Sequence, residues 1–468
     1  KGARVAFGEQ RALDLAPALR ERRLEAVVPA RRQLAALRLE RARVRHRERG
    51  AGLWLAACGG GGGSDDAPAP ARLEPPSASF LVSYMYDWYY WIDRLPPAPV
   101  PATWPAAHAA LAALKVAEDR YSYIEPAATD DAFFDEGRSL GFGITYQIEA
   151  DALALRLVQP RSPAHAAGMR RGDRIIAIDG RSITDILAAD ALAEAFGPTE
   201  VGAGLDFELR RDGRILHASV ARAWYDISYV MAQGIHEAGG RKVGYVNFYS
   251  FGSLGVAPWQ AALDQLAAQG AQDLVVDLRE NGGGLVAVAA QVGAALGQDD
   301  LAGKTMGTLE FNRAHTDANR SFRFTSDPRA GRFERVVWLT GARTCSASEI
   351  LIKGLDPWRP ASRVGTSTCG KPVGFTPPTH EGWVYSVVSF STRNALGEGD
   401  YYDGLAPDCR VTDPVSGEFG EPDEPLLAAA LAWLADGRCP TPVTGKAADA
   451  APRFDDSLRG LSTLTGLR

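Results

Sequence analysis

The stretch 335–375 constrains the fold of this chain most, because strand, turn, helix and loop signals follow one another in it without interruption. The β-branched and apolar run 336–339 predicts a buried strand that leads into a cluster of small residues. Residues 349–355 have the apolar spacing of a helix, which Gly354 and Pro357 end. The segment therefore predicts a strand that passes through a tight turn into a helix.

The turn and the loop beyond the helix hold a candidate nucleophile and a candidate base. Ser346 lies at the turn, near backbone N–H groups of a helix N-terminus that can stabilise an oxyanion. Lys371 follows in a glycine-flanked loop, and a lysine can act as a base only if burial lowers its pKa enough to leave neutral amine near pH 7. The pair suits acyl transfer. On spacing alone, a helix N-cap and a surface charge remain the alternative.

A second motif supports the catalytic interpretation. Residues 273–278 predict a strand, and the sequence Arg-Glu-Asn-Gly-Gly-Gly at 279–284 follows it. The order strand, helix, strand, helix over 242–300 predicts an α/β layer structure. A glycine turn at the start of a helix brings backbone N–H groups together, so we assign one oxyanion donor to Gly283 and the other to Ala347. A turn that needs glycine only for positive φ is the alternative.

Together, the motifs 279–284, Ser-Ala-Ser-Glu at 346–349 and Gly370-Lys371 resemble the carboxy-terminal processing proteases, the tail-specific serine peptidases of family S41. The resemblance covers roughly residues 80–435, with the motifs in the family's order. It implies a Ser–Lys dyad of Ser346 and Lys371 on an α/β core of the crotonase/ClpP-like type. It implies no cofactor, and no Cys or His spacing suggests a metal site.

Residues 138–225 resemble a PDZ domain. Leu140, Gly141, Phe142 and Gly143 predict a loop whose backbone N–H groups bind the C-terminal carboxylate of a peptide, while the adjacent strand edge pairs with that peptide. A strand at 175–178, closed by an Asp-Gly turn, strengthens the assignment. A plain turn before a strand is the alternative for the loop. The predicted partner is a protein or peptide with an apolar C-terminal tail.

The remaining segments complete a multidomain α/β chain. A helical segment rich in aromatic residues is predicted at 78–137, and we expect its aromatic stripe to be a packing surface. The protease core is predicted at 226–438, and a polar tail at 439–468. Residues 1–77 are predicted to be a basic leader and a flexible linker. Residues 1–57 carry 14 Lys and Arg against 6 Asp and Glu, although the whole chain has a net charge of −6, so the rest of the chain is acidic. The acidic body argues against nucleic acid as a partner.

Leu-Ala-Ala-Cys at 55–58 resembles a bacterial lipobox, which implies a lipid on Cys58 and an exported protein in the periplasm or cell envelope. The segment upstream is too long for a signal n-region, so we expect much of 1–45 to precede the start of translation. A basic extension with a chance cysteine is the alternative. Four other cysteines permit two disulfides, and we favour Cys345 with Cys369 and Cys409 with Cys439 among three possible pairings.

The sequence departs from the family beside the lysine. Many members carry a glutamine four residues after it, where this chain has Phe375, and Pro372 replaces a usual glycine. No third catalytic residue can be named. Glu349 is a candidate, although dipole complementarity in a helix's first turn is the favoured explanation. His315 and His380 are the nearest alternative bases, but neither belongs to a triad-like motif.

The sequence thus predicts a serine endopeptidase that cleaves proteins with a Ser–Lys dyad. The rival interpretation is a non-catalytic lipoprotein that binds peptides through its PDZ domain and retains a decayed protease core. A carrier of apolar ligands is a weaker third possibility, because a fold does not fix a function.

Overall fold

The computed structural model describes residues 73–97, 104 and 106–439. The predicted leader, Cys58, nearly all of the linker and most of the tail therefore lie outside the described residues. Among the described residues, none of the helices combines the length and the hydrophobicity that a membrane span requires.

The N-terminal helices are completed by residues from the far end of the chain. They are α3 (Ala78–Trp88), the 3-10 turn η1 (Ile92–Arg94), α4 (Ala107–Leu114) and α5 (Ala127–Phe134). Tyr89 is fully buried, and α3 and α4 pack against Tyr385 and Val388, which confirms the packing role of the aromatic stripe. Strand β1 (Tyr123–Pro126) pairs antiparallel with β19 (Trp383–Ser386), and β18 (Thr379–His380) extends that sheet. Residues 78–137 are therefore not purely helical and do not form a core alone.

The region predicted as a PDZ domain contains a sheet ordered β3-β4-β5-β7-β8 with its own apolar core. Its strands are β3 (Ile144–Ile148), β4 (Leu153–Val158), β5 (Arg174–Ile178), β6 (Arg181–Ser182), β7 (Gly204–Arg211) and β8 (Arg214–Ala221). Its helices are α6 (Pro163–Ala166), α7 (Ile183–Ala188) and α8 (Leu192–Phe196). A separate two-stranded ribbon pairs β2 (Arg138–Gly141) with β9 (Ala223–Asp226). Buried ion pairs join this region to the core: Arg156 of β4 contacts Glu280 at 2.6 Å, and Arg171 contacts Asp413 at 2.7 Å.

The region predicted as the protease core is built on a six-stranded sheet ordered β10-β11-β12-β15-β16-β21. The strands are β10 (Val230–Ala238), β11 (Arg241–Phe248), β12 (Asp273–Asp277), β15 (Arg335–Thr340), β16 (Ser362–Gly365) and β21 (Cys409–Arg410), and all neighbours except β10 and β11 pair in parallel. The helices are α9 (Val256–Ala268), α10 (Val286–Ala294), α11 (Ala347–Leu355) and α12 (Pro425–Asp436). The predicted strand–helix alternation is confirmed.

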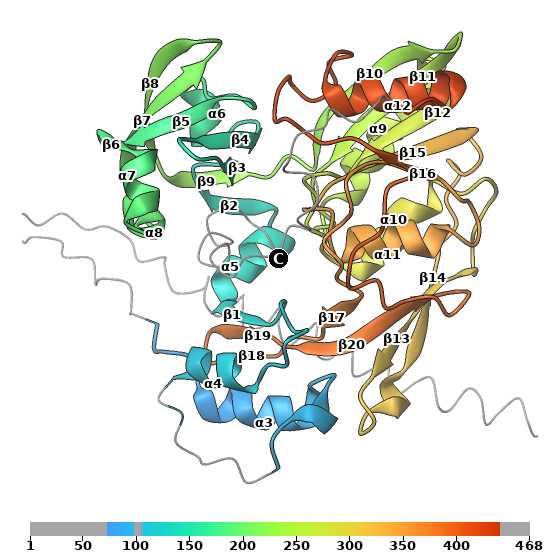
Figure 1. Cartoon of the computed structure of the whole chain (residues 1–468). Coiled ribbons are helices and arrows are strands. Elements are labelled where there is room, and N and C mark those ends of the chain that lie inside the picture. The colour runs from blue at the N-terminus through green and yellow to red at the C-terminus, as the bar shows by residue number, and fades with distance from the viewer. Residues whose placement is uncertain (1–72, 98–103, 105, 440–468) are drawn as a thin grey trace, which may run out of the picture. The chain divides into compact units, whose positions relative to one another are not determined.

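Side chains alternate between the two faces of this sheet, as the period of a strand requires. Leu274 and Trp338 pack with α9, α10 and α11, whereas Val275 and Leu339 pack with α12. Figure 1 shows α12 on one side of these strands and α10 and α11 on the other. Burial on both faces explains why the middle residues of β12 and β15, 274–276 and 336–339, are continuously apolar.

A four-stranded sheet ordered β14-β13-β20-β17 adjoins the core. Its strands are β13 (Thr305–Phe311), β14 (Arg320–Arg323), β17 (Val373–Phe375) and β20 (Val388–Asn394), and the 3-10 turn η2 (Thr316–Ala318) joins the first two. Strand β17 begins two residues after Lys371, so this sheet fixes the loop that carries the candidate base.

Candidate active site

Ser346 occupies a strained turn between β15 and α11. Its φ is +55° and its ψ is −116°, a combination that residues with a Cβ rarely adopt. Such a conformation costs on the order of 1–3 kcal/mol and persists only where the surroundings enforce it. Ser346 is only partly buried, whereas Ala347 and Ser348, the first two residues of α11, are fully buried. The turn therefore presents the serine hydroxyl at the start of α11.

The glycine loop after β12 lies directly against this turn. The Asn281 carbonyl oxygen accepts hydrogen bonds from the Cys345 N–H at 3.1 Å and from the Ser348 hydroxyl at 3.0 Å. A Cβ on Gly283 would come within 2.9 Å of both the Cys345 carbonyl oxygen and the Ser346 Cβ. Only glycine permits this close approach, which is the physical reason for the glycine run. Sequence reasoning had given Asn281 no role.

The backbone N–H groups of the two predicted oxyanion donors differ in their hydrogen bonding. Ala347 is the first residue of α11, where helical N–H groups have no intrahelical partner. The Gly283 N–H, however, donates to the Asn281 side-chain oxygen at 2.9 Å. That bond must be exchanged before Gly283 can donate to an oxyanion, and its role stays a prediction.

Lys371 and Ser346 line the same cavity, which has a volume of about 330 Å³. Lys371 is buried, with 4% of its surface exposed. Its Nζ lies 4.0 Å from the ring centroid of Phe375 and 5.7 Å from that of Tyr121. Tyr121 also donates a hydrogen bond from its hydroxyl to the Gly370 carbonyl oxygen, next to the lysine. The structure thus brings the predicted nucleophile and base to one site.

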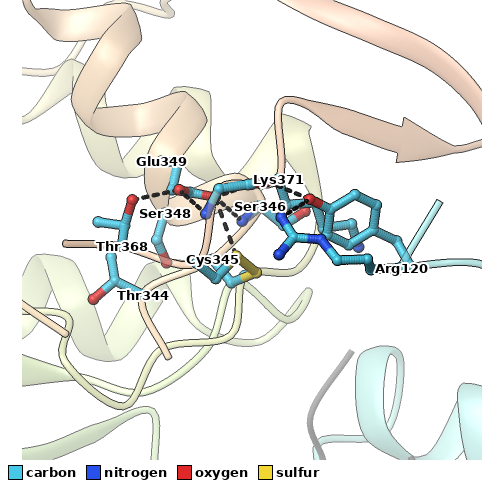
Figure 2. Close-up of a disulfide and its surroundings, with 12 residues drawn as sticks. Arg120, Thr344, Cys345, Ser346, Ser348, Glu349, Thr368 and Lys371 are labelled. Atoms are coloured by element: carbon cyan, nitrogen blue, oxygen red, sulfur yellow. Dashed lines mark hydrogen bonds between the residues drawn. A yellow bond between two sulfur atoms is a disulfide. The ribbon is translucent and has the colours of Figure 1, made fainter. Parts of the chain in front are cut away.

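Glu349 bridges the serine turn and the lysine loop, as Figure 2 shows. Its Oε2 accepts from the backbone N–H groups of Ser346 at 3.0 Å and Lys371 at 2.8 Å. Its Oε1 accepts from the Gly370 N–H at 2.8 Å and from the Thr368 hydroxyl. The carboxyl group is fully buried. Dipole complementarity, the explanation favoured from sequence, is therefore insufficient, because this side chain holds two distant segments together.

Burial raises the pKa of Glu349 to about 7, although the hydrogen bonds from Thr368, Lys371, Gly370 and Ser346 act in the opposite direction. In the unfolded chain the same group titrates near 4.5. Between these values the folded state binds more protons, so the free energy of unfolding falls as pH rises from about 4.5 to about 7. This one group accounts for a change of about 3 kcal/mol.

Replacing Glu349 by glutamine tests both effects. One oxygen becomes an NH₂ group that faces two N–H donors, so the bridge is lost on one side. We expect Glu349→Gln to lower kcat by about 10- to 100-fold on a protein substrate. In the wild type, Glu349 contributes a higher free energy of unfolding at pH 5 than at pH 8. We expect this contribution to be absent when the thermal unfolding of Glu349→Gln is compared at the two pH values. Equal activity of the two proteins would contradict the bridging role.

A disulfide joins the same two segments. Cys345 and Cys369 are bonded with a Cα–Cα distance of 5.2 Å, and Cys409 and Cys439 form the second bond, which confirms the favoured pairing. The Cys369 sulfur, which carries no hydrogen in this state, contacts Glu349 Oε2 at 3.4 Å. Cys345, Glu349 and Cys369 lie close enough to suggest a metal site, but bonded sulfurs offer no thiolate ligand.

Removing the first disulfide should affect stability and activity together. Its closed loop spans 24 residues in sequence, which corresponds to about 3 kcal/mol of stabilisation in the chain-entropy treatment. We expect Cys345→Ala combined with Cys369→Ala to lower the free energy of unfolding by this order, measured by urea titration. The variant should also lose activity at temperatures where it remains folded. Cys409→Ala combined with Cys439→Ala is the matched control, expected to destabilise without an effect on kcat.

The other candidates from the sequence lie elsewhere. His315 contacts Asp87 at 2.7 Å and stacks on Trp88, and His380 stacks on Phe80. Both rings therefore serve contacts with the N-terminal helices, and neither is among the described residues that line the cavity.

In the predicted carboxylate loop, Leu140 and Gly141 belong to β2 and pair with β9. Phe142 is buried in the apolar core of the PDZ region. Gly143 has a φ of +81°, and a Cβ there would strike Ser162, which explains the glycine. The predicted role of these four residues in peptide binding stays a prediction.

Residues 242–411 match the family described as Peptidase family S41, and residues 156–201 match a PDZ domain. This chain carries an S41 peptidase domain and a PDZ domain. The S41 match includes Ser346, Lys371 and the glycine loop, which agrees with the resemblance seen in the sequence. The predicted fold class is also confirmed.

Among curated S41 relatives, the chain is 30% identical over 237 residues to the carboxyl-terminal-processing protease of Synechocystis sp. (strain PCC 6803), covering 50% of this chain and 53% of that protein. It is 26% identical over 286 residues to the carboxy-terminal processing protease CtpA of Bacillus subtilis, covering 60% and 58%. The chain thus spans little more than half the length of these relatives.

The fold of the S41 domain and its neighbours also occurs in a crystal structure from Bacteroides fragilis NCTC 9343, a protein of the S41 protease type. The TM-score is 0.62 at 21% identity, covering 78% of this chain and 99% of that one. This likeness concerns the fold alone.

Proposed function

We propose that this protein is a serine endopeptidase in which Ser346 is the nucleophile and Lys371 the general base. The observation that carries the proposal is the shared cavity: a serine in a strained turn at a helix start and a buried lysine both line it. Glu349 and the Cys345–Cys369 disulfide tie the two segments together. Such preorganisation is what acyl transfer requires of a nucleophile and its base.

The reaction proceeds in two halves. The uncharged Lys371 amine takes the proton of the Ser346 hydroxyl as the oxygen attacks the scissile carbonyl carbon. The N–H of Ala347, and that of Gly283 once released from Asn281, stabilise the oxyanion. The ammonium of Lys371 then gives its proton to the leaving amine, and an acyl-enzyme forms. Water attacks this ester with Lys371 again as base, which releases the new C-terminal carboxylate and restores Ser346.

The cavity indicates which substrates fit. Its walls include the apolar side chains of Leu285, Val286, Leu309, Ile350 and Phe390. An apolar side chain beside the scissile bond is therefore favoured by burial. The PDZ domain is proposed to bind an apolar C-terminal tail through backbone N–H groups of residues 140–143 and through strand pairing.

The proposal is tested with a permanently unfolded substrate, such as reduced and alkylated casein, and with a fluorophosphonate label. We expect cleavage into fragments and an adduct on Ser346, located by peptide mass spectrometry. A substrate whose last three residues are changed to aspartate should be cleaved more slowly. A folded protein that neither cleaves nor labels would overturn the proposal.

The alternative function is a non-catalytic peptide-binding protein. It is favoured by the Gly283 N–H, which is engaged by Asn281, and by Phe375 at the position where many family members carry a glutamine. Binding of C-terminal peptides without cleavage in the same assay would support this alternative.

We further propose that the protein is exported and anchored by a lipid on Cys58. The proposal rests on the lipobox-like sequence 55–58 and on two disulfides, which form in oxidising compartments. Expression in a bacterial host followed by mass spectrometry of the N-terminal peptide tests it. Recovery of an unmodified Cys58 within a longer chain would contradict it.

A further inference from the structure

The Lys371 amine lies against aromatic ring faces from two separate segments. Phe375 is the last residue of β17, and its ring centroid is 4.0 Å from Nζ. Tyr121 comes from the segment before β1, with its centroid 5.7 Å from Nζ. Ring faces carry negative electrostatic potential, so they attract an ammonium group and define where it lies.

The position of Phe375 is set by an irregularity in the sheet. Gly374 pairs with Phe390, but Phe375 pairs with Val388, so Ser389 is an extra residue in β20. A bulge of this kind redirects the neighbouring side chains. The Ser389 hydroxyl accepts a hydrogen bond from the Thr376 N–H at 2.9 Å, which holds the strand just beyond the ring.

Both rings are held by further contacts. Phe375 packs edge-on against Tyr123, with centroids 5.7 Å apart and an interplanar angle of 87°. The Tyr121 hydroxyl donates to the Gly370 carbonyl oxygen and accepts from Arg120 at 2.9 Å. Arg120 in turn donates to the Tyr402 carbonyl oxygen at 2.9 Å. The aromatic faces are thus fixed features of the site, independent of the lysine.

We propose that Phe375, supported by Tyr121, is the positioning residue for Lys371. Its ring face holds the amine in the cavity shared with Ser346 and stabilises the ammonium that forms when the amine takes the serine proton. The inference rests on the proposed peptidase function. Many family members carry a glutamine at this position. The inference gives the task of orienting the lysine amine to the face of the Phe375 ring instead.

The test uses three variants and the wild type. Phe375→Leu keeps an apolar side chain but removes the ring, whereas Phe375→Tyr keeps the face. Phe311→Leu is the matched control, because Phe311 is buried in the same four-stranded sheet and is not among the described residues that line the cavity. We expect Phe375→Leu to lower kcat about tenfold with KM unchanged, a size typical of a desolvated cation over a ring. Phe375→Tyr should restore kcat, and Phe311→Leu should leave it near the wild-type value.

Three outcomes would overturn the inference: an unchanged kcat in Phe375→Leu, a change confined to KM, or an equal loss of kcat in Phe311→Leu. A readout without catalysis separates this from failure of the peptidase proposal. In protein labelled with ¹³C-lysine, the ε-methylene signal of Lys371, identified by its absence in Lys371→Arg, should lie upfield because of the ring current. Phe375→Leu should remove that shift. A wild-type signal at the ordinary position would overturn the inference even if the protein is inactive.

Discussion

Ser346→Ala is expected to lower kcat on an unfolded protein substrate by roughly 10⁵-fold, because alanine has no hydroxyl oxygen to attack the scissile carbonyl carbon. KM should change little, since the cavity walls that bind substrate remain. The measurement is the initial rate of fragment release at saturating substrate, with the wild type assayed in parallel. Full activity of the variant would exclude Ser346 as the nucleophile.

The strained backbone at Ser346 supplies a control for folding. Alanine keeps a Cβ at φ +55°, so Ser346→Ala should melt near the wild-type temperature. Glycine adopts this conformation without the steric cost, so Ser346→Gly should be more stable by roughly 1 kcal/mol and equally inactive. A glycine variant less stable than the wild type would contradict the strain at this turn.

The sequence was sufficient for the features that local pattern determines. The apolar runs that became β12 and β15 were recognised because both faces of the sheet are covered, and the small residues at 345–348 marked the turn. The motif order also led to Ser346 and Lys371, which line one cavity.

The features that depend on distant contacts could not be predicted in this way. Strand β1 pairs with β19, which lies about 260 residues later, and the local sequence pattern does not predict which distant strand it pairs with. The role of Glu349 emerged only from burial and from four donors supplied by two segments. Phe375 read as a departure from a family pattern, whereas the structure gives its ring a contact with the lysine amine. In each case the sequence named the residue and the fold defined its partner.

Lys371→Arg is expected to lower kcat by at least 10³-fold, even though it keeps a positive charge in the cavity. A guanidinium stays protonated at all accessible pH values, so it cannot take the serine proton. Lys371→Ala should lose activity to a similar extent, because it removes the base but not the nucleophile. Both rates are measured as for Ser346→Ala, with circular dichroism to confirm that each variant is folded.

Chemical rescue separates loss of the base from loss of structure. Lys371→Ala removes the equivalent of propylamine from a cavity of about 330 Å³, so added propylamine has room to enter. Only the uncharged amine can accept the serine proton, so rescue should rise with pH at constant total amine. Lys371→Arg should show no rescue, because its side chain still fills the site. If propylamine does not restore Lys371→Ala while Ser346 in that variant still reacts with the fluorophosphonate label, Lys371 is not the base, and another group must take the proton from the serine.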